Sequence, residues 1–175
     1  MMDNVIVFGV GTQGTRLFVS ILENIGWSVG STTKTMEYHW AQNINKQLLI
    51  EDDICPCGNS LYGYPICTKC DQDVEKFVRS PLDVEQCLDN LDTPWVIKDP
   101  RFVLTLHYQP WDDVWDKYKP CMLYVSRDYN TLVEKYKRKW TNLYDIYGCS
   151  LKELVMLAES RYLSWPYNKI HITFE

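Results

Sequence analysis

The chain has 175 residues, of which 46% are hydrophobic and 14% aromatic, and its formal net charge is −5. These values predict one globular domain over residues 1–175 and exclude a disordered or fibrous chain. The negative charge argues against a nucleic-acid partner bound through phosphate neutralisation. No apolar run approaches the roughly 18 residues of a membrane span, and the N-terminus lacks a signal-peptide pattern, so we expect a cytoplasmic protein.

The first predicted strand covers residues 5–8 and runs into a turn, residues 9–14, with glycine at its first, third and sixth positions. Apolar residues then recur at helical spacing: Leu17, Phe18, Ile21, Leu22 and Ile25. A strand, glycine turn and helix in this order present backbone N–H groups to a phosphate. The spacing is also that of a dinucleotide fingerprint. The alternative is a tight turn that binds nothing.

Three elements follow before the middle of the chain. The first helix should end near Gly26, and residues 27–29 are a short second strand. Residues 30–35 form a polar loop, where a doubly wound sheet binds ligands. Residues 37–50 have weak helical character.

The second half alternates predicted helices with short apolar strands. In chain order these are a helix from Ser80-Pro81 to Leu91, a strand at 95–97, a helix capped by Asp99 and begun by Pro100, a surface turn or short helix at 112–119, a strand at 121–125, a helix at 132–140, a helix opened by the capping box Ser150–Glu153, and a strand at 170–174. Strands separated by helices predict an α/β fold, a three-layer parallel sheet flanked by helices.

Residues 52–79 are a cysteine-rich insert within this domain. Its four cysteines have the spacing C-x-C-x₉-C-x₂-C, and they are Cys55, Cys57, Cys67 and Cys70. Four thiolates on two tight turns suit a structural, tetrahedral Zn²⁺. A disulfide pair and an iron–sulfur cluster are the alternatives, since the first pair is one residue tighter than the usual C-x₂-C. The insert either covers a ligand site of the domain or docks a protein partner.

Four segments together resemble the bacterial sulfotransferase-like family. Residues 95–102, with Lys-Asp-Pro-Arg at 98–101, look like that family's "KDPR" segment. Residues 9–15 are similar to its 5′-phosphosulfate loop, residues 123–128 resemble its 3′-phosphate strand with Arg-Asp, and residues 172–175 look like its late strand. The order and spacing fit over nearly the whole chain outside residues 52–79. The resemblance implies a P-loop-type fold and use of 3′-phosphoadenosine 5′-phosphosulfate (PAPS).

The resemblance also implies an activity. Such an enzyme moves a sulfuryl group from PAPS to a hydroxyl or amine of a small-molecule or carbohydrate acceptor, and releases adenosine 3′,5′-bisphosphate. Lys98 would lie at the bridging oxygen, and Glu37 or His39 would be the base. The residues expected to hold the nucleotide are Gly11, Thr12, Gln13, Gly14, Thr15, Arg16, Arg127 and Lys135.

The chain departs from the family pattern at several of these positions. Thr12 stands where Arg or Lys is usual, Gln13 replaces Ser, and Arg16 replaces Ser or Thr. Lys135 lies eight residues after Arg127, where the family usually has Ser. Two other functions therefore stay open. One is an NADP-linked or nucleotide-binding Rossmann-like protein, and the other is a catalytically inactive relative whose zinc insert makes protein contacts.

Overall fold

The computed structural model describes the chain in several segments, which are residues 3–11, 13–30, 32, 36–51, 84–109, 111–139 and 150–174. The predicted zinc cysteines of residues 52–79 lie outside these segments, as do Thr12, Trp140 and the predicted helix start at Ser80-Pro81.

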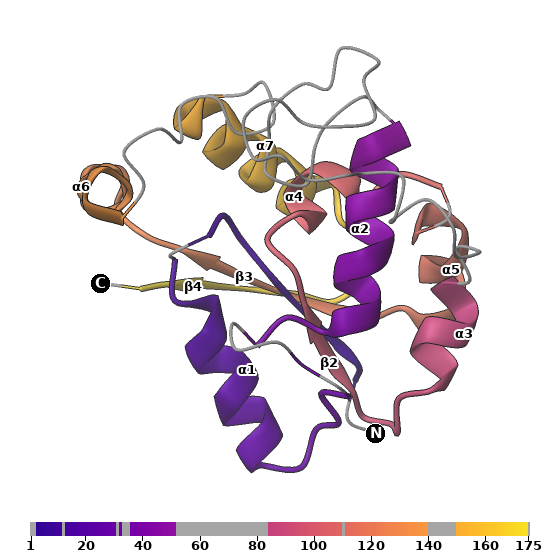
Figure 1. Cartoon of the computed structure of the whole chain (residues 1–175). Helices are drawn as coiled ribbons and strands as arrows, with labels where there is room; N and C mark the ends of the chain where they lie inside the picture. Colours follow the sequence, from indigo (N-terminus) through magenta and orange to yellow (C-terminus); the bar gives the residue numbers. More distant parts are fainter. Residues whose placement is uncertain are drawn as a thin grey trace.

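A small parallel sheet forms the centre of the molecule (Figure 1). Its strands are β1 (Val5–Phe8), β2 (Val96–Lys98), β3 (Cys121–Ser126) and β4 (Lys169–Thr173), and their order in space is β2-β1-β3-β4. Val7 pairs with Lys98 of β2, and Phe8 pairs with Tyr124 of β3. The carboxyl ends of β2, β1 and β3 therefore lie side by side. This confirms the predicted α/β class with an all-parallel sheet.

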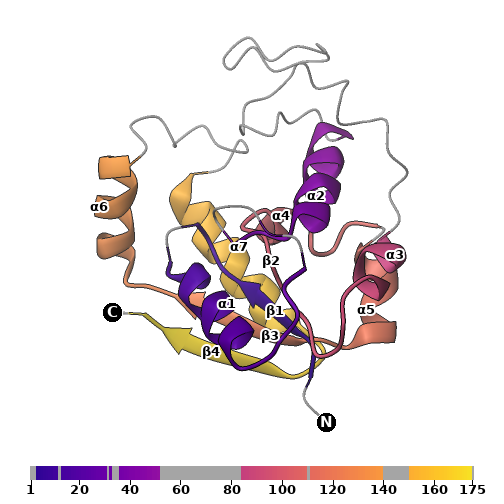
Figure 2. The ribbon, with the colours of Figure 1, turned by 60° about the horizontal axis from the view of Figure 1, so that its bottom comes forward.

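Helices cover both faces of the sheet (Figures 1 and 2). The helices of the described segments are α1 (Thr15–Asn24), α2 (His39–Glu51), α3 (Val84–Asp89), α4 (Phe102–Thr105), α5 (Trp111–Tyr118), α6 (Tyr129–Lys139) and α7 (Leu151–Ser164). Of these, α1 covers one face of the sheet, and α2, α4 and α7 lie on the other (Figure 2). The predicted capping box at Ser150 and Glu153 opens α7 and is confirmed.

Each face of the sheet has its own apolar core. Ile6 and Phe8 of β1 point into the larger core with Trp95 and Trp111, whereas Val5 and Val7 belong to the smaller one under α1. Side chains alternate between the faces of a strand, so a strand buried on both faces reads as a continuous apolar run. That is why the sequence of β1 shows no polar alternation.

One strand prediction needs correction. Residues 27–29 were expected to form a strand, but only Ser28 bridges to Trp95, as an isolated parallel pair. The predicted strand at 170–174 is confirmed as β4, and its side chains are mostly exposed. Among the described residues β4 pairs only with β3, so it is an edge strand of the sheet.

The structure adds detail to two helix predictions. Of the five apolar residues that recur along α1, Phe18 and Leu22 pack against the smaller core. Leu17, Ile21 and Ile25 are 47%, 44% and 61% exposed. Val19 is buried instead, because the side of α1 that faces the sheet passes through Thr15 and Val19. In α5, predicted as a surface element, Trp111 and Trp115 are buried. These two indoles stack with ring centroids 5.2 Å apart.

No helix in the described segments has the length and apolar character needed to cross a lipid bilayer.

Candidate functional site

The glycine turn lies at the carboxyl edge of the sheet, between the ends of β2 and β3. Gly9 has a φ of 150°, and a Cβ there would lie 2.6 Å from the carbonyl oxygen of Val125. Gly14 has a φ of 94° and precedes α1, and a Cβ on it would lie 3.2 Å from the Phe174 ring. These glycines are therefore required by close backbone and ring contacts as well as by left-handed φ at Gly14.

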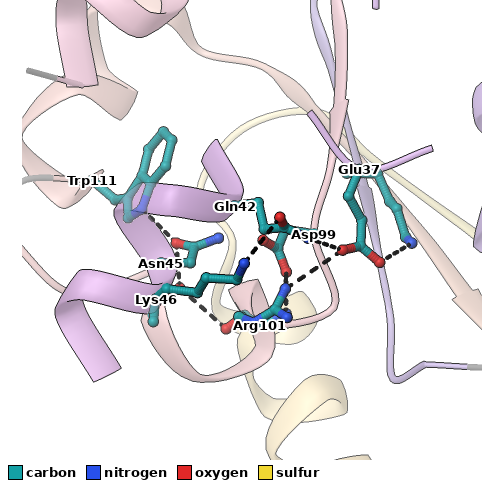
Figure 3. Close-up of polar contacts among 9 residues, drawn as sticks. Glu37, Gln42, Asn45, Lys46, Asp99, Arg101 and Trp111 are labelled. Carbon is teal, nitrogen blue, oxygen red and sulfur yellow. Dashed lines mark hydrogen bonds and ion pairs between the residues drawn. The ribbon is translucent and has the colours of Figure 1, made fainter. Parts of the chain in front are cut away.

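A buried ion-pair cluster follows β2. Lys98 Nζ lies 3.2 Å from Glu37 Oε1, and Arg101 Nη1 lies 3.5 Å from Glu37 Oε2 and 2.9 Å from Asp99 Oδ1. Lys98, Glu37 and Asp99 are only 4%, 8% and 1% exposed. Figure 3 shows the carboxylates of Glu37 and Asp99 directed at the Arg101 guanidinium. Burying an ionised side chain costs free energy unless a group of opposite charge lies beside it, as is the case here.

A turn in the backbone holds the carboxylate of Asp99 against the cluster. Asp99 Oδ1 accepts a hydrogen bond from the backbone N–H of Arg101 at 2.8 Å, in addition to the bond from the Arg101 guanidinium. The sequence predicted that Asp99 would cap a helix begun by Pro100. That prediction is wrong, because α4 begins at Phe102 and has no side-chain cap. Asp99 instead closes the turn that carries Arg101.

The first turns of α2 complete the surroundings of Glu37 (Figure 3). Gln42 donates from Nε2 to Glu37 Oε2 at 2.6 Å, and Lys46 donates to Gln42 Oε1 at 3.2 Å. Glu37 thus receives contacts from Lys98, Arg101 and Gln42. The sequence identified Glu37 as a candidate base but missed Gln42 and Lys46. Their signal was the i+4 spacing of two polar residues on a helix that follows Glu37.

A buried amide joins α2 to the turn that bears Arg101. Asn45 Oδ1 accepts from Thr105 Oγ1 at 2.8 Å and from the Trp111 indole at 2.7 Å. The Thr105 hydroxyl also lies 3.1 Å from the Arg101 carbonyl. Asn45 is fully buried and was not identified from the sequence. It links the helix that positions Gln42 to the segment that positions Arg101.

Burial is the main influence on the pKa values of the two lysines in this cluster. Burial lowers the pKa of Lys98 and the positive charge of Arg16 lowers it further, whereas Glu37 and Asp99 oppose the change. Burial likewise lowers the pKa of Lys46, helped by the charge of Arg101. Arg16, which lies on α1, therefore contributes to lowering the pKa of Lys98. An anionic ligand placed among these cations would be stabilised by them.

Arg127 follows β3 on the other side of the glycine turn and is 8% exposed. Its guanidinium carbon lies 4.5 Å from the centroid of the Phe174 ring, and its Nε donates to the Phe174 carbonyl at 3.4 Å. The Phe174 ring also lies beside Gly14, 3.2 Å from the position that a Cβ on Gly14 would occupy. Arg127 is thus held against Phe174, the residue whose ring flanks Gly14.

The remaining predicted residues are distributed as follows. Gly11 faces the Tyr136 hydroxyl of α6, which a Cβ on Gly11 would approach to 3.2 Å. Lys135 is the exposed neighbour of Tyr136. His39 is exposed at the start of α2 and, among the described residues, joins no hydrogen bond or ion pair of the cluster. The structure therefore brings Glu37, not His39, to Lys98.

In the described segments, no three or more His, Cys, Asp and Glu side chains are grouped so as to hold a metal ion. The described residues that gather at the carboxyl edge are Gly9, Gly14, Glu37, Lys98, Arg101 and Arg127. No protein-family model, curated protein or solved structure matches this chain.

Proposed function

We propose that this protein is a PAPS-dependent sulfotransferase with its nucleotide site at the carboxyl edge of the sheet. The observation that carries the proposal is the adjacency of three segments. The glycine turn follows β1, which lies between β2 and β3, so it has Lys98 on one side and Arg127 on the other. Carboxyl ends of parallel strands are the usual ligand site of open α/β sheets. The segments that resemble the family thus meet in one place.

The strand order supports this choice over a Rossmann-like dinucleotide site. In the Rossmann order the strand that is second in sequence lies next to the first. Here the segment second in sequence, at Ser28, bridges to Trp95 on the outer side of β2, and β2 lies between it and β1. This arrangement is compatible with the P-loop-type fold that the resemblance implies. In a Rossmann fold, an acidic residue that follows the second strand binds the ribose of the dinucleotide. In this chain the second segment is not adjacent to β1, so a residue there is not placed for that contact.

The residues present fit a doubly phosphorylated nucleotide. The turn at residues 9–14 leads directly into the N-terminus of α1, whose free N–H groups suit the 5′-phosphate. The Arg127 fork suits the 3′-phosphate, because a guanidinium can bond two oxygens at once. Arg16, whose charge acts on Lys98, supplies a cation that the turn itself lacks among its described residues.

PAPS, when bound, supplies a sulfuryl group whose departure leaves additional negative charge on the 5′-phosphate. Lys98 is the residue suited to stabilise that charge, since its ammonium is buried and fixed by Glu37. Glu37 Oε1 and Oε2 are suited to accept the proton of an acceptor hydroxyl. Arg101 and Gln42 hold the Glu37 carboxylate in place for that role.

Calorimetric titration with adenosine 3′,5′-bisphosphate tests the proposal. We expect saturable binding by the wild-type chain. Arg127→Met keeps a long apolar side chain but removes the guanidinium, and should weaken bisphosphate binding by about ten- to a hundred-fold. Adenosine 5′-monophosphate, which lacks the 3′-phosphate, is the matched ligand control and should bind both forms equally.

Two results would contradict the proposal. Equal weakening of both nucleotides in Arg127→Met would remove the 3′-phosphate assignment. Binding of NADP, titrated in parallel, without binding of the bisphosphate would restore the Rossmann-like alternative. If the bisphosphate binds but no acceptor is sulfated in a screen of hydroxyl and amine compounds, the inactive-relative alternative is favoured.

A further inference from the structure

The outer side of β4 carries a row of backbone groups that no described strand pairs with. β4 lies at the border of the sheet, and its partner among the described residues is β3 alone (Figure 2). The N–H of Met122 donates to the Asn168 carbonyl, and the N–H of Phe174 donates to the Ser126 carbonyl. In a parallel pair, alternate residues of a strand direct both backbone groups to the same neighbour. The even-numbered residues of this strand therefore face β3. The backbone groups at the outer side belong to Lys169, His171 and Thr173.

The side chains of β4 leave this outer side open. Proteins protect such an edge with lysine side chains, proline or a bulge. Lys169 does not serve in that way, because its Nζ donates to the Leu163 carbonyl at 2.7 Å. The His171 ring is turned toward β3, where it stacks on Tyr124 and its Nε2 lies 2.7 Å from Ser126 Oγ. β4 contains no proline or glycine. Its outer side is therefore suited to pairing with a further strand.

The sequence of β4 matches a second copy of itself. The strand reads Lys-Ile-His-Ile-Thr, so isoleucines stand on both sides of His171. An antiparallel copy centred on His171 brings Ile170 opposite Ile172 of the second copy, twice over. Ile170 is 54% exposed and shares a face of the strand with Ile172. Apolar cross-strand pairs stabilise a sheet, and a two-fold contact requires a surface that is complementary to itself.

We propose that β4 pairs antiparallel with β4 of a second copy of this chain and joins the two sheets into one. His171 exchanges two backbone hydrogen bonds with His171 of the second copy, and Lys169 and Thr173 exchange the same pair of bonds at either end. The contact uses no residue assigned to the nucleotide, so it goes beyond the proposed function.

The size of this contact sets the expected affinity. A stable interface buries about 800 Å² on each partner, and the edge of a five-residue strand buries less. The dimer should therefore be reversible, with a Kd of about 1–100 µM.

The charge of the chain gives the dimer a salt dependence of known sign. Each copy carries a net charge of −5, so two copies repel each other at long range. β4 itself contains no acidic residue, and its attraction for the second copy comes from backbone and apolar groups. Added salt screens the repulsion and should tighten the dimer. A basic protein on the same surface would instead bind this acidic chain more weakly in salt.

Analytical ultracentrifugation over a concentration series tests the proposal on the wild type and three variants. Ile170→Lys places a charge in the contact without changing the backbone. Thr173→Pro removes an outward N–H, a change that edge strands tolerate. Ile25→Lys is the matched control, because it makes the same change at an isoleucine of α1 that is 61% exposed. Thermal unfolding of each variant verifies that it is folded.

We expect the wild type to dimerise, and more tightly as salt is raised. Ile170→Lys and Thr173→Pro should each weaken dimerisation by about ten-fold or more, because two sites per dimer are changed. Ile25→Lys should match the wild type. If Thr173→Pro fails to fold, Ile170→Lys decides alone, since its side chain is exposed in the single chain.

Three results would overturn the proposal. The first is a wild type that stays monomeric throughout a series that exceeds the expected Kd. The second is a dimer that both β4 variants leave unchanged. The third is a dimer that Ile25→Lys disrupts and Ile170→Lys does not, which would assign the contact to α1.

Discussion

Lys98 is the residue whose protonation should control binding at the carboxyl edge. Its pKa is lowered by burial and by Arg16, so it loses its positive charge at a lower pH than an ordinary lysine. The protonated form attracts an anion, so affinity for adenosine 3′,5′-bisphosphate should fall as the pH rises through this lowered pKa. Calorimetric titration from neutral to alkaline pH measures the decline.

Lys98→Met provides the comparison for this pH dependence. It should bind the bisphosphate more weakly at neutral pH and lose part of the alkaline decline. The arginine charges do not titrate in this range, whereas Lys46, whose pKa is also lowered by burial, still does. Lys152→Met, at an exposed position of α7, is the matched control and should keep the wild-type profile. An alkaline decline that is the same in Lys98→Met and the wild type would show that another group is responsible.

At the scale of single elements, the capping box of α7 offers a test that is independent of any ligand. Ser150 Oγ accepts from the backbone N–H of Glu153 at 3.2 Å, and Glu153 Oε2 accepts from the backbone N–H of Ser150 at 2.7 Å. Ser150→Ala should lower Tm by about 2–4 °C, because a helix N–H loses its partner. Ser164→Ala, at the other end of the same helix, is the control and should change Tm less.

The capping box also has a pH dependence of known sign. Hydrogen bonds from Ser150 hold the pKa of Glu153 below its usual range. The stabilisation is therefore present above the ordinary pKa of glutamate and is lost as the pH falls through the lowered value. The Tm difference between wild type and Ser150→Ala should shrink in acid. A constant difference across this range would mean that the carboxylate contributes nothing to the cap.

At the scale of the whole molecule, the metal content of the chain remains a sequence-based prediction. Four cysteines at 55, 57, 67 and 70 suit one tetrahedral Zn²⁺, and such a site stabilises a segment too short for its own core. Elemental analysis of the purified chain should find about one zinc per chain. A Cys55→Ser, Cys57→Ser double variant should lose it, whereas Cys149→Ser should not. A metal-free wild type would overturn the prediction.

The sequence predicted the architecture better than the site. Apolar runs and a capping box are local signals, so β1, β3 and α7 were found with nearly correct bounds. Which side of α1 faces the sheet depends on packing between distant segments. The apolar spacing along α1 therefore did not reveal that Leu17, Ile21 and Ile25 are exposed while Phe18 and Leu22 pack against the core.

The side-chain contacts of the site also depend on segments that are distant in sequence, so local patterns did not predict them. Lys98 and Glu37 were identified one by one, but their pairing spans 61 positions in sequence and depends on the sheet. Asn45 gave no signal at all, because a polar residue in a weak helical pattern reads as a surface residue. Gln13 was expected to hold the nucleotide, but the sequence did not show that its side chain is fully buried with no hydrogen-bond partner among the described residues.

The position of Phe174 has a consequence for the order in which this protein assembles. Its ring contacts both Gly14 and Arg127, so the turn near residue 10 is enclosed only after residues 121–126 and 169–174 have joined the sheet. Contacts between such distant segments form slowly, because a long loop must close first. A chain with β1 and α1 already formed would still lack the complete anion site that we propose. Ligand binding during refolding would therefore report the docking of β4, and a probe of helix content would change earlier.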